Sequence, residues 1–339
     1  MRPRTVLATV TATLAAAASL VAAGPAGARS AAACSPSVAI ERFSDALDKT
    51  TYEGAFVGNF SALAVDRDGA LAAVSDRSVL FSLDGRTLQP RGTLPLADEY
   101  GAALDSEGLV VDRDGTYLVS SETEPSVRRH SRDGRVLDRL PVPDALRVAP
   151  AGRAPVNGTF EGLTMTRDGR TLVASMEYAL GGDVAGTVRV QTWRRTHDDR
   201  FRPAAQYAYR TDPGLGVPEI TATPDGRLLV LERGFTAGVG NTVRLYLADP
   251  RRATDVSEIE QLTERGGVRP IRKTLLADLA DCPDLGATAR QPQPNPLLDN
   301  IEAMAVTGRP HGRLDVLLTS DDNQNPAQTT RFYFLRVRL

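Results

Sequence analysis

Three glutamates recur at the same position of a repeated unit in this chain of 339 residues. Glu107, Glu161 and Glu302 each open a short apolar run, and Glu219 lies one residue off that position, counted from the Asp-Gly turn of its own unit. If the units surround a common axis, these carboxylates meet and repel one another unless a cation lies between them. Calcium takes about six to eight oxygen ligands. We therefore predict that Glu107, Glu161, Glu219 and Glu302 bind a divalent cation, with Ca²⁺ as the first candidate.

The same repetition is also compatible with acidic residues that only cap strand ends or accept hydrogen bonds from backbone amides. Histidine occurs only at His130, His197 and His311, which argues against a zinc centre. The sequence has no Gly-x-Ser-x-Gly nucleophile motif and no phosphate-binding glycine loop. Hydrolysis by this chain would therefore use a metal-activated water.

A second acidic series ends the next apolar run of each unit, and arginine directly follows two of its members. Arginine binds carboxylate and phosphate groups through two parallel hydrogen bonds. These side chains could hold an anionic substrate, or they could simply neutralise each other within the fold. The predicted substrate-binding residues are Asp76, Arg77, Glu122, Glu177, Glu232, Arg233 and Asp321.

The elements that must position these residues are short β-strands. The five recognisable units start 46, 54, 58 and 83 residues apart, and four of them contain a tight Asp-Gly turn between two apolar runs. Units of this length without helical periodicity predict an all-β fold, a β-propeller. The longest gap could hide a further copy, with strands at 241–248 and 273–279. We therefore expect six blades, with seven as an alternative; a β-sandwich would not explain the repeated register.

The two ends of the mature chain are expected to close the propeller within one blade. Residues 331–337 alternate apolar and basic side chains, as a closing strand does, and residues 38–43 could pair beside them. We see no second domain, so residues 34–339 are predicted to form a single propeller domain.

The N-terminus reads as a secretory signal peptide at residues 1–28. Arg2 and Arg4 precede an uncharged, alanine-rich run, and small residues follow at the positions that a signal peptidase recognises. The run is too short and too rich in Ala and Thr for a membrane span, so we expect a secreted protein without a transmembrane segment. A lipoprotein anchor at Cys34 is the less favoured alternative.

Cys34 and Cys282 are the only cysteines. Outside the cytoplasm such a pair is expected to be oxidised, although two free thiols are the alternative. We predict a disulfide that closes a loop of 248 residues. In the chain-entropy model a loop of this size contributes roughly 4–5 kcal/mol to stability.

Composition narrows the range of partners. The chain has 40 basic and 42 acidic residues, a formal net charge of −2 and 42% hydrophobic residues, which is typical of a globular protein. Without a basic block it lacks the electrostatic signature of a nucleic-acid-binding protein. We expect a monomer that acts on a small molecule.

The ordered series of these segments resembles a known family. Its members are Phe60-Ser61-Ala62-Leu63, Ser106-Glu107-Gly108-Leu109, Met176-Glu177-Tyr178, Leu231-Glu232-Arg233-Gly234-Phe235 and Asn300-Ile301-Glu302-Ala303-Met304. In this order they resemble the secreted phytase-like family, also described as esterase-like activity of phytase, over about residues 50–338. The resemblance implies a six-bladed propeller, a location outside the cytoplasm and dependence on a divalent metal.

Two functions follow as hypotheses. The first is a secreted, metal-dependent hydrolase of an ester, a lactone or a phosphate ester, with its metal in the central channel. The second is a non-catalytic extracellular propeller that keeps the carboxylates as a structural calcium site and binds a ligand or a protein.

Overall fold

The computed structural model describes residues 32–264 and 267–339. The predicted signal peptide at residues 1–28 lies outside these residues and stays a prediction. Every named strand pair in the described ranges is antiparallel, and their only helices are single 3₁₀ turns: η1 (Asp144–Leu146), η2 (Pro250–Arg252), η3 (Leu279–Asp281) and η4 (Pro310–Gly312). None of these helices is long or apolar enough to cross a membrane.

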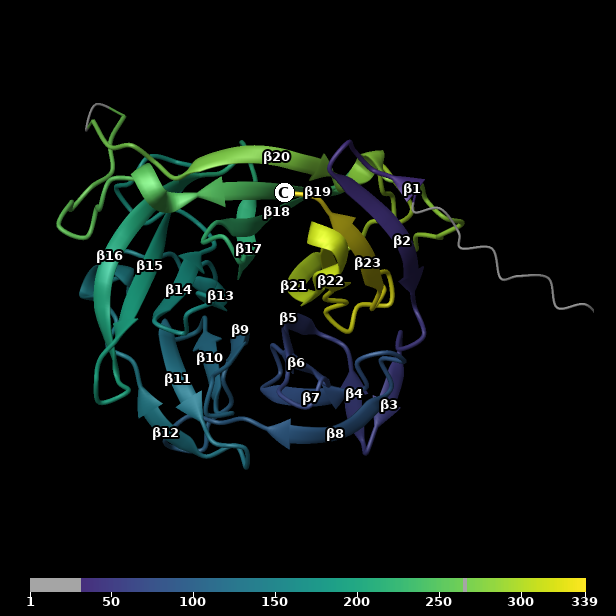
Figure 1. Ribbon diagram of the computed structural model, residues 1–339, viewed down its shortest axis with the longest axis horizontal. Helices are drawn as coiled ribbons and strands as arrows, with labels where there is room; N and C mark the ends of the chain where they lie inside the picture. The colour runs from purple at the N-terminus through teal and green to yellow at the C-terminus, as the bar shows by residue number, and fades with distance from the viewer. Residues whose placement is uncertain (1–31, 265–266) are drawn as a thin grey trace, which may run out of the picture. The chain divides into compact units, whose positions relative to one another are not determined.

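The strands form five blades around a common centre (Figure 1). Blades 1 to 4 each contain four strands in chain order from the centre outwards. Blade 1 contains β5 (Phe60–Val65), β6 (Leu71–Ser75), β7 (Val79–Leu83) and β8 (Pro90–Pro95), and blade 2 contains β9 (Ser106–Val111), β10 (Tyr117–Ser121), β11 (Ser126–His130) and β12 (Val136–Arg139). Blade 3 contains β13 (Phe160–Met165), β14 (Thr171–Met176), β15 (Thr187–Arg195) and β16 (Phe201–Arg210). Blade 4 contains β17 (Gly216–Ala222), β18 (Leu228–Thr236), β19 (Gly240–Asp249) and β20 (Arg272–Asp278).

Blade 5 joins the two ends of the described chain. Its strands are β21 (Ile301–Gly308), β22 (Leu314–Ser320) and β23 (Phe332–Val337), followed outwards by β2 (Val38–Ser44) and β1 (Ala32–Ala33). The predicted closure is confirmed, because β2 pairs with β23 along its length. A separate hairpin, β3 (Thr50–Tyr52) with β4 (Ala55–Val57), lies between β2 and blade 1 in the chain.

The predicted disulfide is present between Cys34 and Cys282. Both cysteines are buried in the apolar cluster that fills the space between blades 4 and 5. The bridge ties the segment between β1 and β2 to the segment that follows η3, and so it links the N-terminal strands of blade 5 to the end of blade 4.

The expected count of six blades is wrong: the described residues form five. The segments 241–248 and 273–279, which we expected to belong to a hidden copy, are the third and fourth strands of blade 4. They pair outwards from β18 and do not begin a sheet of their own. The long interval before Glu302 instead comes from two long connections, at 250–271 and 279–300, which add no blade.

Apolar side chains between neighbouring blades hold the ring together. Separate buried clusters join blades 1 and 2, blades 2, 3 and 4, blades 4 and 5, and blades 5 and 1. The inner strands β5, β9, β13, β17 and β21 contact one another in that order, and β21 returns to β5.

This arrangement gives the inner strands two distinct ends. We call the end at which they begin, beside the last residues of the second strands, the start edge. We call the end at which the Asp-Gly turns lie the turn edge. Glycine is required in these turns because the backbone there is left-handed, with φ of 80° at Gly69 and 84° at Gly226.

Candidate functional site

The backbone register brings two acidic series to the start edge. In four blades the residue after the second strand donates its N–H to the carbonyl of a residue just before the inner strand; Glu122, for example, bonds to Asp105 at 2.9 Å and Glu177 to Thr159 at 2.7 Å. In blade 4, Arg233 pairs with Gly216 in the same way. Equivalent side chains from all five blades therefore meet at this edge.

Three of the five equivalent positions on the inner strands hold the predicted glutamates. In register order these positions are occupied by Ser61, Glu107, Glu161, Pro218 and Glu302. The matching positions after the second strands are occupied by Asp76, Glu122, Glu177, Arg233 and Asp321.

Glycine allows the inner strands to approach closely here. A Cβ atom at Gly108, directly after Glu107, would lie 2.5 Å from the carbonyl oxygen of Glu161, and one at Gly162 would lie 2.5 Å from the backbone nitrogen of Ile220. A larger residue at either position would push neighbouring blades apart. The Glu-Gly pairs therefore place carboxylates from adjacent blades close together.

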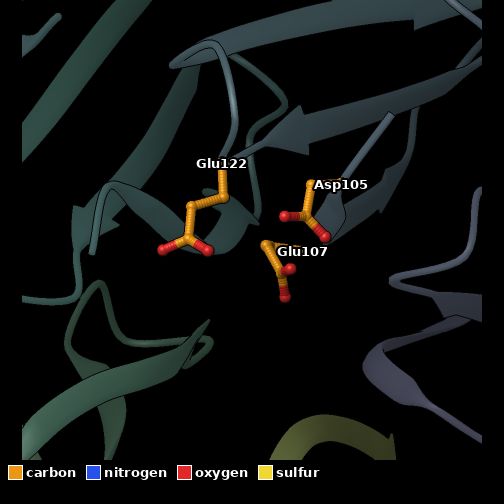
Figure 2. Close-up of side chains that lie close together, drawn as sticks. All are labelled: Asp105, Glu107 and Glu122. Carbon is orange, nitrogen blue, oxygen red and sulfur yellow. The ribbon is translucent and has the colours of Figure 1, made fainter. Parts of the chain in front are cut away.

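The carboxylate oxygens form two overlapping groups. One contains Asp105, Glu107 and Glu122, and Figure 2 shows these three side chains converging on a shared space. The other contains Glu122, Glu161 and Glu177. Within each group, one oxygen of each residue lies within 4.8 Å of the others. Glu122 belongs to both groups and joins them.

Burial and mutual repulsion keep protons on several of these groups. Desolvation, followed by the charges of Glu302, Asp105 and other carboxylates, raises the pKa of Glu107 well above its usual range, and Glu161 is affected in the same way. Desolvation raises the pKa of Glu177 to about 7 and that of Asp76 to about 6. In the absence of a cation, this cluster is not fully ionised at neutral pH.

One arginine lies within the cluster. A terminal nitrogen of Arg233 lies 3.0 Å from Oε1 of Glu302 and 3.3 Å from Oε1 of Glu177, and the side chain is mostly buried. Its Nε has no hydrogen-bond partner among the described residues. Arg77, in contrast, points mostly into solvent and lies 3.4 Å from Asp76. One guanidinium cannot balance the surrounding carboxylates, so the site has an excess of negative charge.

The predicted ligand Glu302 belongs to neither carboxylate group, although it contacts Arg233 beside them, and neither group includes Asp76 or Asp321. Glu219 and Glu232 have partners elsewhere. Oε1 of Glu219 accepts hydrogen bonds from the backbone nitrogens of Ile220 at 2.8 Å and Leu163 at 3.2 Å, because it follows Pro218, which occupies the position of the other glutamates. Glu232 precedes the equivalent position and instead contacts Tyr209 at 2.6 Å and Lys273 at 2.5 Å. Neither carboxylate is placed to bind a cation with the others.

Asp105 was not among the predicted residues, although the structure places it in the cluster. It precedes the inner strand of blade 2, and Oγ1 of Thr123 lies 3.2 Å from its carboxylate. The available signal was its place two residues before Glu107, where blades 1 and 5 have Asn59 and Asn300.

The donor set matches a hard divalent cation. All the grouped ligand atoms are carboxylate oxygens, and no histidine or cysteine joins them within the described ranges. Such a set suits calcium or magnesium rather than zinc. The cluster can therefore hold a metal ion, whereas the identity of that ion and the ligand role of each residue stay predictions.

The fold and the site together define this protein as a β-propeller with a buried carboxylate cluster at one edge. The chain belongs to the phytase-like family, described as esterase-like activity of phytase, whose model matches residues 55–324.

Individual relatives are more distant or less informative. An uncharacterized secreted protein of Arthroderma benhamiae is 32% identical over 230 residues, which cover 52% of this chain and 45% of that protein. The chain thus matches less than half the length of this relative.

Matches among solved structures include a putative gluconolactonase and the virginiamycin B lyase of Staphylococcus aureus. The first is 14% identical with a TM-score of 0.42, covering 81% of this chain and 74% of its own. The second is 10% identical with a TM-score of 0.38, covering 85% of this chain and 83% of its own.

Proposed function

We propose that this protein is a metal-dependent hydrolase that cleaves an ester, a lactone or a phosphate ester at the start edge of the propeller. The observation that carries the proposal is the excess of buried carboxylates there, which one arginine does not balance. Membership of the phytase-like family supports an ester or phosphate ester as the substrate class.

Asp105, Glu107, Glu122, Glu161 and Glu177 would hold the cation, for which Ca²⁺ is the first candidate. When bound, a cation of this kind polarises the scissile group and lowers the pKa of a water. The protein contributes oxygen donors from the inner strands of blades 2 and 3, which hold Glu107 and Glu161, and from the residues that flank the inner and second strands, which are Asp105, Glu122 and Glu177. Because burial and neighbouring carboxylates raise the pKa values of Glu107 and Glu161, binding the cation also releases protons.

Two further side chains could contact the substrate. Arg233, whose Nε has no partner within residues 32–264 and 267–339, would hold an anionic group or a developing negative charge. Tyr178 follows Glu177 and is partly exposed, and burial followed by the charge of Glu177 raises the pKa of its hydroxyl to about 12. This hydroxyl stays protonated at physiological pH and can donate a hydrogen bond.

The protein is proposed to act outside the cytoplasm. Its disulfide is of the kind that persists in oxidising compartments, and the Arthroderma benhamiae relative is described as secreted. The predicted signal peptide would provide the export route, and the monomeric state stays a prediction.

The test begins with chelation of the purified protein and the return of Ca²⁺, Mg²⁺ or Mn²⁺. Turnover is then measured on a panel of aryl esters, lactones, aryl phosphates and phytate. We expect hydrolysis of at least one class that is lost on chelation and restored by metal. Absence of metal-restored turnover on the whole panel would reject the enzymatic proposal.

Glu161→Gln is the decisive variant, and Glu219→Gln is its matched control, because both replace a buried glutamate on an inner strand with an isosteric amide. We expect Glu161→Gln to lose activity at least 100-fold with its thermal stability retained, and Glu219→Gln to keep its activity. If Ca²⁺ stabilises the wild type but nothing is hydrolysed, the cluster is a structural calcium site in a binding protein.

A further inference from the structure

A pocket lined by arginines lies at the turn edge, away from the carboxylate cluster. It has a volume of about 670 Å³, which is within the range of small-molecule sites. It lies between the turns of blades 2 and 3 and the outer strands β15 and β16. Five arginines and a histidine line it: Arg113, Arg170, Arg194, Arg195, Arg202 and His197.

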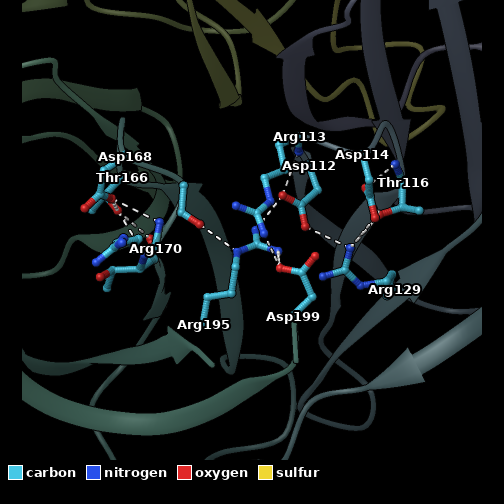
Figure 3. A network of polar contacts seen from close by, with 12 residues as sticks. Asp112, Arg113, Asp114, Thr116, Arg129, Thr166, Asp168, Arg170, Arg195 and Asp199 are labelled. Carbon is cyan, nitrogen blue, oxygen red and sulfur yellow. Dashed lines mark hydrogen bonds and ion pairs between the residues drawn. The ribbon is translucent and has the colours of Figure 1, made fainter. Parts of the chain in front are cut away.

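Two of the five arginines are already balanced by carboxylates (Figure 3). Arg195 donates to Oδ1 of Asp112 at 2.5 Å and to the carbonyl of Gly169 at 2.7 Å, and its guanidinium stacks on the ring of Phe201. Arg113 pairs with Asp199. These contacts fix one wall of the pocket.

The other three arginines have no such balance. All three are exposed, and none of them forms an ion pair within residues 32–264 and 267–339: Arg170, Arg194 and Arg202. Two acids act on them at longer range: Asp168 is close to Arg170 and Arg194, and Asp198 is close to Arg202, but neither acid lines the pocket. The pocket therefore has a net positive charge.

The strand register places these charges against one another. Arg194 on β15 lies directly opposite Arg202 on β16, and on its other side it lies opposite Thr171, the residue after Arg170. Like charges directly opposite each other in neighbouring strands destabilise a sheet. Arg170 is held beside this pair, because its carbonyl accepts a hydrogen bond from the backbone nitrogen of Arg195 at 2.8 Å. The repulsion would be relieved by an anion that contacts all three guanidinium groups.

We propose that this pocket binds a small anion with several phosphate groups. Each guanidinium offers a planar pair of donors that matches two phosphate oxygens. Three guanidinium groups, from the turn before β14 and from β15 and β16, match linked phosphates better than a single one. The site is independent of the carboxylate cluster, which would repel such an anion in the absence of a metal.

Inorganic tripolyphosphate is the probe, titrated calorimetrically into the full mature chain in the presence of EDTA. We expect saturable binding with one site per chain, weakened by added NaCl, and weaker binding of citrate, a trianion without phosphate groups. Absence of saturable binding, equally tight binding of citrate, or binding that EDTA abolishes would overturn the proposal.

The test variant combines Arg170→Gln, Arg194→Gln and Arg202→Gln. The control combines Arg86→Gln, Arg252→Gln and Arg309→Gln, three exposed arginines that do not line the pocket. We expect the first variant to weaken binding at least 10-fold and the control to change it less than 2-fold. Equal losses in both variants would show non-specific attraction and overturn the proposal.

Thermal unfolding shows whether the test variant is folded and gives an independent readout. Without ligand, the test variant should melt at or above the temperature of the wild type, because the repulsion between Arg194 and Arg202 has been removed. Tripolyphosphate should raise the melting temperature of the wild type and of the control variant but not that of the test variant. Hydrolase activity should be unchanged in both variants, which separates this proposal from the proposed function.

Discussion

Acidic residues lie at both ends of the inner strands, but their pKa values are raised at the start edge and lowered at the turn edge. At the start edge, desolvation and neighbouring carboxylates raise the pKa values of Glu107, Glu161 and Asp76. At the turn edge, burial of Asp66 and Asp112 acts in the same direction, but contacts with Arg132 and Arg195 outweigh it and lower both pKa values.

The difference lies in the partners rather than in burial alone. Asp112 is as buried as the start-edge glutamates, yet it accepts hydrogen bonds from Arg129 at 2.8 Å and from Arg195 at 2.5 Å. A buried carboxylate with a cationic partner on each oxygen is a completed structural contact. Buried carboxylates that share one arginine must keep protons or gain a further cation. This contrast supports our proposal that the start edge is the metal site.

The largest effect is expected from removing the arginine of the start edge. Arg233→Gln leaves Glu177 and Glu302 without their cationic partner, and breaking a buried ion pair in this way costs about 3–5 kcal/mol. Chemical denaturation in EDTA at pH 7.5 measures the loss. The loss should shrink at pH 5, where Glu177 is protonated, because its pKa is about 7. A variant as stable as the wild type at pH 7.5 would show that the cluster does not depend on Arg233.

The second effect is a pH dependence that differs between the edges. A carboxyl group whose pKa is raised in the folded state stabilises the fold below its unfolded pKa, and this contribution is lost as the pH rises through the folded value. The metal-free protein should therefore lose stability between about pH 4 and 7, where Asp76 and Glu177 ionise in the unfolded chain before they ionise in the folded protein. Glu177 alone, raised from 4.5 to about 7, corresponds to about 3 kcal/mol.

Calcium should reverse this trend, because it favours the ionised carboxylates. The measurement is thermal unfolding with EDTA and with Ca²⁺ at each pH, and the difference between the two series should grow as the pH rises. The aspartates of the turn edge have lowered pKa values, so their contribution is lost only at more acidic pH. A calcium effect that is the same at pH 5 and pH 8 would contradict the assignment of the raised pKa values to the metal site.

Much of this arrangement could be predicted from the repeated unit. The shared position of Glu107, Glu161 and Glu302 follows from repetition alone, and so does the propeller, since strand pairing carries equivalent residues to one edge. Closure by residues 38–43 could be predicted because an alternating strand at one terminus needs a partner. The number of blades could not, because loop length does not show whether a strand joins an existing sheet or starts a new one.

Blade 4 shows why single residues were misplaced. Counting eight residues from the turn aspartate reaches Asp76, Glu122 and, in blade 4, Arg233. Glu232, one residue earlier, is the acidic residue at this end of the strand, so a prediction based on acidic character fell on it. In the inner strand of blade 4, Pro218 takes the position that glutamate holds in blades 2, 3 and 5, so Glu219 lies one residue beyond it. The offset of Glu219 is visible in the sequence by counting from the turn, but the count differs in blade 3, where Glu177 lies nine residues after Asp168. Asp105 could be found only from its alignment with Asn59 and Asn300.

A third, smaller effect is expected at the turn edge from Asp112→Asn. The amide keeps one oxygen acceptor but places a donor opposite Arg129 or Arg195, so a charged hydrogen bond is lost at a cost of about 2 kcal/mol. Equilibrium denaturation measures this cost, and the calcium affinity should stay within 2-fold of the wild type. A large loss of calcium affinity would show that the two edges are coupled.

The smallest effect is expected from Asp225→Asn, in the turn of blade 4. The hydrogen bond and charge of Arg227 lower the pKa of Asp225, yet both side chains are partly exposed. Solvent screening limits such pairs to about 1 kcal/mol or less. The amide oxygen can still accept the hydrogen bond of Thr223 at 2.6 Å, which preserves the turn. Asp112→Asn and Asp225→Asn change the same residue type at the same edge, so the ratio of their effects on the free energy of unfolding isolates burial. Equal costs would mean that burial does not decide how strongly a turn-edge carboxylate stabilises the fold.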